Sequence, residues 1–131
     1  MQKVKYSLVF LFAFLIFWGC KKENDHTPIS GSIGLDVLVK HHNRALGSIH
    51  VFLKNNVQDF PGRNDSLYDM RVETDASGMA HFSSLFPGNY FIYAHGWDPG
   101  VLDSVWGYKG AILNNQTVSN NQITIGIAVS E

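Results

Sequence analysis

The sequence predicts an all-β protein, a two-sheet sandwich of about seven strands that follows an N-terminal signal segment. Three observations favour this class. Beyond residue 31, apolar residues recur at every second position in several short segments, which is the period of a β-strand. Pairs of Gly, Pro, Asn and Asp separate these segments, as turns do. No segment after the signal has a convincing helical period.

Residues 1–19 have the features of a secretion signal. Lys3 and Lys5 precede an apolar segment at 6–18, which is shorter than the ~20 residues needed to span a bilayer. Cys20, the only cysteine of the chain, follows this segment. An intramolecular disulfide is therefore excluded, and the domain must be stable through its core alone.

A cysteine placed directly after an apolar segment and a small residue resembles the lipoprotein box of bacterial lipoproteins. The resemblance implies that Cys20 carries acyl chains such as palmitate and becomes the mature N-terminus after cleavage at Gly19. Several acyl chains anchor a protein firmly to a membrane. An ordinary or uncleaved signal peptide is the alternative. Lys21, in place of aspartate, favours the outer membrane, and the polar tether at residues 20–31 is similar to signals that export lipoproteins to the cell surface.

The charge balance argues against a nucleic-acid partner. Without residues 1–19, which include Lys3 and Lys5, the chain keeps 8 of its 10 Lys and Arg side chains against 11 Asp and Glu, a formal charge of −3. The sequence has no basic stripe that would neutralise phosphates. Residues 32–131 are long enough for one domain with a two-sheet core.

The first half of the domain contains three predicted strands. Residues 33–39 and 49–53 alternate between apolar and other side chains, and residues 41–47 connect them. The polar segment 54–66 is longer than the usual loop of about 4 to 6 residues, so it is a candidate functional loop. A third strand follows at 67–74, with one apolar and one polar face.

Two tight turns in the segment 74–94 are expected to join three successive strands. Asp75 and Gly78 suit the first and fourth positions of a type I turn, and Pro87-Gly88 has the type II pattern. Beyond the second turn, side chains alternate between two faces. One face carries Tyr90, Ile92 and Ala94, and the other carries Phe91, Tyr93 and His95.

The same segment resembles the carboxypeptidase-regulatory-like domain and related prealbumin-like (transthyretin-like) sandwiches. The matching positions are Thr74, Asp75, Gly78, Phe82, Leu85, Pro87, Gly88, Tyr90, Ile92 and Ala94. With the earlier strands and the last one, the resemblance covers most of residues 32–129. It implies a prealbumin-like (Ig-like) β-sandwich that serves as an accessory, adhesive or binding module without catalytic residues.

The last part of the domain contains two more predicted strands, at about 104–113 and at 123–129. The segment 96–110, which overlaps the first of these two strands, combines aromatic, acidic and glycine residues. Its candidate ligand-binding residues are Trp97, Asp98, Asp103, Trp106 and Tyr108. Aromatic rings suit sugar rings or a protein partner, and carboxylates accept hydrogen bonds from hydroxyl groups. The alternative is that Trp97 and Trp106 cover an open end of the sandwich.

The six histidines do not predict a metal site. His41 and His42 are neighbours in a connection, while His81 and His95 are expected on the outward face of adjacent strands, near Tyr93. A zinc site needs three or four convergent ligands, and the sequence places only two. We therefore expect solvated histidines, no metal and no cofactor.

Enzyme functions find no support in the sequence. Hydroxyisourate hydrolases of prealbumin-like fold carry a C-terminal Tyr-Arg-Gly-Ser motif, whereas this chain ends in Ala-Val-Ser-Glu, and no serine has the context of a nucleophile elbow. Some pilin-type relatives form a Lys-Asn isopeptide bond beside an acidic residue. Lys40, Glu73 and Asn120 or Asn121 have the required order, although Lys40 and Glu73 fall on the polar faces of their strands.

These observations predict an outer-membrane, surface-exposed lipoprotein whose sandwich is a non-catalytic binding or assembly module. Its expected partners are the membrane, through lipid on Cys20, and an envelope protein or glycan at the segment 96–110. A carbohydrate-binding module is the alternative function.

Overall fold

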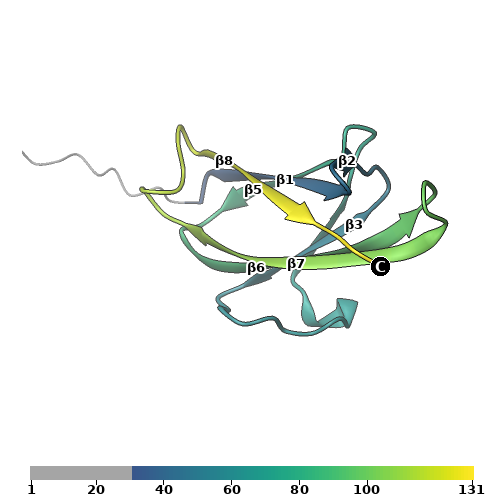
Figure 1. Cartoon of the computed structure of the whole chain (residues 1–131). Coiled ribbons are helices and arrows are strands. Elements are labelled where there is room, and N and C mark those ends of the chain that lie inside the picture. The colour runs from purple at the N-terminus through teal and green to yellow at the C-terminus, as the bar shows by residue number, and fades with distance from the viewer. Residues whose placement is uncertain (1–30) are drawn as a thin grey trace, which may run out of the picture.

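A computed structural model describes residues 31–131, so the predicted signal segment, Cys20 and nearly all of the tether lie outside the described residues. Within this range, eight strands form two four-stranded sheets packed face to face (Figure 1). Residues 31–131 contain a single helical turn, the 3₁₀ element η1 at Asp65–Leu67, and no helix long and apolar enough to cross a membrane. The predicted all-β sandwich is confirmed.

The first sheet is built around β1 (Ile33–His41). Along one edge β1 pairs antiparallel with β5 (Met79–Leu85) and with β2 (Arg44–Ala45), a two-residue strand that the sequence did not predict. Along the other edge it pairs in parallel with β8 (Gln122–Ala128). The first and last strands of the domain therefore lie side by side (Figure 1).

The second sheet has the order β4-β3-β6-β7 and is antiparallel throughout. It contains β3 (His50–Asn55), β4 (Met70–Glu73), β6 (Gly88–Asp98) and β7 (Asp103–Leu113). The two longest strands, β6 and β7, form a hairpin of 11 residues each. This hairpin contains the whole segment from which a binding site is expected.

The inner faces of the two sheets share one apolar core. The alternation expected for the first two strands and for β6 is confirmed, because every second residue of these strands belongs to the core between the sheets. On the opposite face of the second sheet, Phe52, Phe91 and Tyr93 are also buried, although they lie outside that core. The largest completely buried apolar side chains are Ile33, Leu35, Val37, Val39, Ile49, Val51, Leu53, Ile92, Val105 and Leu113. Removal of this surface from water is the main stabilising contribution to the fold.

Both connections of the segment 74–94 cross from one sheet to the other, which corrects the expectation that its successive strands are adjacent in one sheet. β4 lies in the second sheet, β5 in the first and β6 in the second again, so β5 pairs with β1 and β6 pairs with β3 and β7. Turn residues fix the local course of the backbone but not the partner of the next strand. Here the apolar side chains of β5 and β6 enter the same core from opposite sheets.

The first turn confirms its prediction and explains its residues. Gly78 N–H donates to the carbonyl oxygen of Asp75 at 2.9 Å, which closes the turn. Oδ1 of Asp75 accepts hydrogen bonds from Ser77 and from the Met79 N–H, and these bonds hold the pKa of Asp75 below its usual value. Buried Thr74 donates its hydroxyl to the Leu46 carbonyl at 2.7 Å, which fixes the neighbouring loop.

The second turn differs from its prediction. Gly88 has a φ of 155°, whereas the third residue of a type II turn needs a φ of about +80°. Phe86 and Pro87 therefore connect β5 to β6 without a type II turn, and Tyr90 stabilises this crossover by donating its hydroxyl to the Phe86 carbonyl at 2.7 Å.

Candidate binding surface

The outer face of the second sheet carries a row of aromatic side chains. Tyr90, Ile92 and Ala94 of β6 fill the core, so the alternate residues of that strand point outward. The β6–β7 register sets Tyr93 opposite Tyr108, His95 opposite Trp106, and Trp97 opposite Ser104. Residues far apart in the segment 96–110 thus share one face.

The long connection between β3 and β4 packs against part of this face. Phe60 stacks on Tyr108, with ring centroids 4.2 Å apart and an interplanar angle of 9°. Tyr68 stacks on Tyr93 at 5.5 Å and donates its hydroxyl to the Gly62 carbonyl at 2.8 Å. Burial raises the pKa of Tyr68 to about 12, so this hydroxyl keeps its proton. The connection that the sequence marked as a functional loop is therefore a cover for the sheet.

A groove lies where this cover ends. Arg63 places its Cζ 4.0 Å from the ring centroid of Trp106, a cation–π contact, and Asp65 bonds to His95 Nε2 at 2.9 Å. The groove has a volume of about 440 Å³, and its lining includes Arg63, His95, Trp106 and Glu131. The groove therefore combines an aromatic ring, that of Trp106, with the positive charge of Arg63 and the negative charge of Glu131.

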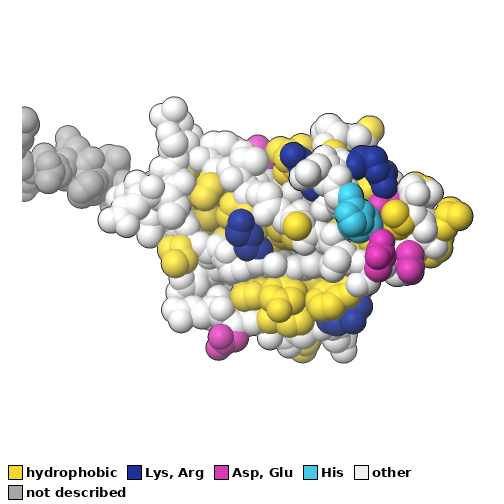
Figure 2. Space-filling model, viewed as in Figure 1, with side chains coloured by type: hydrophobic (Ala, Val, Ile, Leu, Met, Phe, Trp, Pro, Cys, Tyr) yellow, Lys and Arg dark blue, Asp and Glu magenta, His cyan; other side chains and the backbone are white. Residues whose placement is uncertain are grey.

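Three side chains, Trp97, Trp106 and Tyr108, form what we call the aromatic strip. Trp97 is 53% exposed and Tyr108 is 49% exposed, while Trp106 is half-buried beneath Arg63. Figure 2 shows a band of hydrophobic side chains on this face, below β7 in that view. The alternative that Trp97 and Trp106 cover an open end of the sandwich is wrong, because both lie on the outer face of the β6–β7 hairpin.

Asp98, which the sequence analysis predicted to be a ligand-binding carboxylate, is completely buried instead. It lies on the inner face of β6, at an even number of residues from the core residues Ile92 and Ala94. Its Oδ2 accepts a hydrogen bond from Arg44 at 2.7 Å and contacts His41 Nδ1 at 2.8 Å, and its Oδ1 accepts from the Gly100 N–H at 2.8 Å. Both oxygens are occupied, so Asp98 fixes the hairpin end and the β1–β2 turn.

The Arg44 guanidinium holds the pKa of Asp98 well below its usual range, and the bonds from His41 and Gly100 act in the same direction against the effect of desolvation. Asp98 is therefore ionised throughout the neutral range. Asp103, the other candidate carboxylate, is exposed opposite Asp98, and within residues 31–131 it accepts a hydrogen bond only from the Ser104 N–H, at 2.7 Å.

The structure separates two histidines that the sequence placed together. His81 lies on β5 and pairs with Asp36, whereas His95 lies on β6 and pairs with Asp65. These strands belong to different sheets, so the two side chains do not share a face. The expectation of a common surface near Tyr93 is wrong for His81.

The structure also rules out the candidate isopeptide pair. Asn121 lies beside Gly34, whose N–H donates a hydrogen bond to the Asn121 carbonyl oxygen. Lys40 is six residues further along β1. A strand rises about 3.3 Å per residue, so these positions are separated by roughly 20 Å. Glu73 lies in the other sheet.

The network of His41, Arg44 and Asp98 was missed by sequence reasoning. Arg44 and His41 lie at positions that face each other across the β1–β2 turn, and Asp98 comes from a strand 54 residues later. Because Arg44 and Asp98 are far apart in the sequence, no local pattern predicted their contact. The even spacing of residues 90, 92, 94 and 98 does indicate that Asp98 points inward.

No protein-family model matches the sequence, and no curated protein matches it. Among solved structures, the chain is similar to the full-length major pilin SpaD from Corynebacterium diphtheriae, with 14% identity and a TM-score of 0.53 over 76% of this chain. It is also similar to BcpA, the major pilin subunit of Bacillus cereus, with 10% identity and a TM-score of 0.51 over 75% of this chain. The chain spans only 30% and 29% of these two pilins.

A third similar structure is PA1324 from Pseudomonas aeruginosa, described as a candidate carbohydrate-binding protein, with 13% identity and a TM-score of 0.45 over 76% of this chain and 89% of that one. That score is too low to support an argument. The likeness to the two pilins shows the fold alone: an Ig-like β-sandwich, in agreement with the prealbumin-like resemblance of the sequence.

Proposed function

We propose that the protein is a non-catalytic binding module of the bacterial cell envelope, anchored by lipid on Cys20, that contacts a protein partner through the aromatic strip. The observation that carries this proposal is the exposure of Trp97 and Tyr108 on the β6–β7 hairpin. Aromatic residues and arginine are enriched at protein–protein interfaces, and here Arg63 lies within the same surface.

The stacking pattern favours a protein partner over a glycan. A sugar ring binds on the flat face of an aromatic side chain, but Phe60 already occupies one face of Tyr108 and Arg63 one face of Trp106. Trp97 stacks on no other aromatic ring within residues 31–131, and its half-exposed side chain offers a flat surface. Trp97 and the charged groove beside Trp106 keep a carbohydrate-binding module as the second candidate.

The hydrogen bonds of the described histidines support a non-catalytic role. His41, His81 and His95 each contact a carboxylate, but within residues 31–131 none is hydrogen-bonded to a serine, threonine or tyrosine hydroxyl. Nucleophilic catalysis needs a hydroxyl or thiol within hydrogen-bond reach of its base.

Replacing Trp97 by alanine is expected to reduce recovery of the partner at least about tenfold in a cross-linking pull-down from intact cells. Trp97 is exposed and outside the core, so the free energy of unfolding should change by no more than about 0.5 kcal/mol. The matched control is Phe86→Ala, since Phe86 is also exposed, at 64%, but lies in the β5–β6 crossover. Equal recovery with both variants would contradict the proposed surface, and loss of binding to a glycan array with Trp97→Ala would favour the second candidate.

Anchoring is tested by Cys20→Ala. The variant is expected to leave the membrane fraction and to lose incorporation of labelled palmitate, because the chain has no other cysteine to carry the lipid. Cell fractionation with the wild-type chain as control gives the measurement. A variant that stays in the membrane fraction and still incorporates palmitate would rule out lipid on Cys20.

A further inference from the structure

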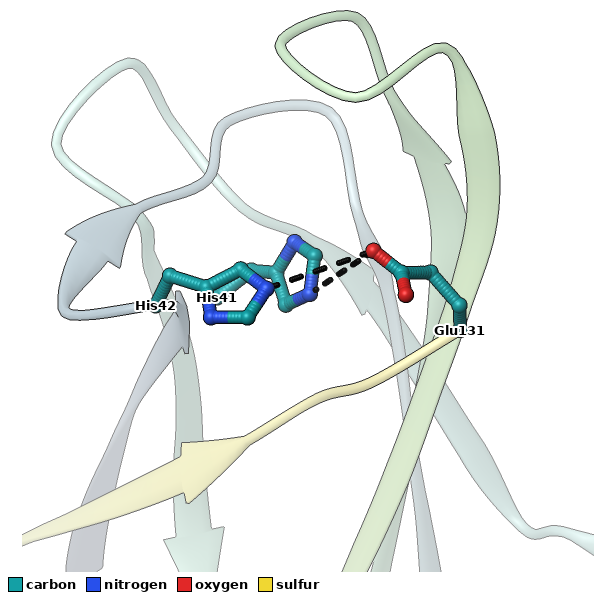
Figure 3. Close-up of side chains that lie close together, drawn as sticks. All are labelled: His41, His42 and Glu131. Atoms are coloured by element: carbon teal, nitrogen blue, oxygen red, sulfur yellow. Dashed lines mark ion pairs between the residues drawn. The ribbon is translucent and has the colours of Figure 1, made fainter.

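Two histidines at the end of β1 and a glutamate that follows β8 lie close together in the described domain (Figure 3). His41 is the last residue of β1, His42 begins the turn to β2, and Glu131 follows β8. Oε1 of Glu131 lies 3.6 Å from His41 Nε2 and 4.0 Å from His42 Nε2. One ligand atom from each residue lies within 4.8 Å of the other two.

The β1–β2 turn brings the two imidazole rings together. Neighbouring residues of a regular strand point to opposite faces. His42 and Asn43 have positive φ values of 48° and 63°, which is the pattern of a two-residue type I′ hairpin. The His41 and His42 ring centroids are consequently only 4.1 Å apart, and Figure 3 shows both rings directed toward Glu131.

Asp98 fixes the orientation of the buried His41 ring. It accepts hydrogen bonds from Arg44 and from the Gly100 N–H, so it acts as an ionised acceptor in each of these contacts. The proton of a neutral His41 therefore lies on Nδ1, 2.8 Å from Asp98. The lone pair of Nε2 is left pointing toward Glu131. A carboxylate that holds the far nitrogen of a histidine is the usual support for a metal ligand.

Glu131 is held in place through its neighbour. Ser130 forms two backbone hydrogen bonds with Trp106, of 2.9 and 3.0 Å, which attach the segment to the edge of β7. The positive charge of Arg44 is balanced by Asp98. The negative charge of Glu131 therefore faces the two histidines.

We infer that His41, His42 and Glu131 form a binding site for Zn²⁺ or a similar divalent transition-metal ion. Ligand atoms of a tetrahedral zinc site with bonds of about 2.0 to 2.1 Å lie ~3.4 Å apart. The two separations from Glu131 Oε1, 3.6 and 4.0 Å, are slightly longer, so small side-chain rotations would bring the three ligand atoms onto one ion. Imidazole nitrogen and carboxylate oxygen are both ligands that this ion takes, and three protein ligands leave the fourth position open. The site goes beyond the proposed function, and the ion would join the β1–β2 turn to the last segment of the chain.

The test uses the purified full-length chain in detergent, stripped of metal and titrated with Zn²⁺. We expect one bound ion per chain and a rise in Tm of roughly 10 °C at a free zinc concentration about 100 times the Kd. His42→Asn is expected to weaken zinc binding at least about tenfold, as is Glu131→Gln. Asparagine tolerates the positive φ at position 42, and both altered side chains are exposed, so folding should be preserved.

The control is His81→Asn, which removes another exposed histidine that is paired with a carboxylate. It should bind zinc as the wild type does. The inference is overturned if the wild-type chain binds no zinc, or if His42→Asn and Glu131→Gln bind it as tightly as the wild type.

Discussion

Replacing Asp98 by asparagine is expected to lower the Tm by roughly 10 to 20 °C at pH 7. Asp98 is fully buried, and its charge compensates Arg44 and receives the hydrogen bonds of His41 and Gly100. Removing one partner of a buried ion pair is strongly destabilising because it leaves the other charge uncompensated. Since Arg44 is half exposed, part of its charge can be solvated, so the variant should still fold. Thermal unfolding followed by circular dichroism gives the measurement.

The pH dependence of this effect has a defined sign. The folded pKa of Asp98 is lowered, so its contribution to stability is fully present above the unfolded pKa of about 4 and is lost as the pH falls toward the folded pKa. The difference in Tm between the wild type and Asp98→Asn should therefore shrink below about pH 4. Asp103→Asn, at the exposed position opposite Asp98, is the control and should change the Tm little. A Tm of Asp98→Asn equal to that of the wild type at pH 7 would contradict the buried network.

Replacing Gly78 by alanine is expected to lower the free energy of unfolding by about 2 to 4 kcal/mol. Gly78 has a φ of 81°, a conformation that L-residues rarely adopt. A Cβ at this position would lie 2.9 Å from the Cβ of Ala45 and 3.0 Å from the carbonyl oxygen of Val39, neither of which is the end of a flexible side chain. Urea unfolding at neutral pH measures the loss.

Gly126→Ala is the matched control for this prediction. Gly126 lies in β8, and a Cβ there would meet no atom within 4 Å. Alanine at this position should be neutral or slightly stabilising, because it restricts the unfolded chain without a clash. If both variants unfolded at the same urea concentration, the close packing of the Asp75–Gly78 turn against β1 and β2 would be contradicted.

The fold could be predicted from the sequence where the signal was local. Alternation in β1, β3 and β6 identified the buried faces, and Asp75 with Gly78 identified a turn that the structure contains. The pairing of strands was not local. The parallel contact of β1 with β8 joins the two ends of the domain, and the β5–β6 crossover uses residues that also suit a hairpin turn. These pairings are decided by the burial of the apolar face of each strand in one common core.

The candidate surface was predicted in part. Trp97, Trp106 and Tyr108 do share a face, because the β6–β7 hairpin sets their positions in register. Asp98 was placed among them by its position in the sequence, although its spacing from Ile92 and Ala94 gives it the phase of the core. The proximity of Glu131 to His41 and His42 depends on the parallel β1–β8 pairing and the Ser130–Trp106 bridge, for which residue spacing gives no indication.

The most direct test of the proposed function is site-specific photo-cross-linking in intact cells, with a photoreactive phenylalanine analogue in place of Trp97 or, as the control, in place of Phe86. Both positions are exposed, but only Trp97 belongs to the aromatic strip. The proposal predicts a recurrent adduct with one envelope protein from position 97 that is absent from position 86. Adducts that are the same from both positions, or no adduct from position 97, would contradict it.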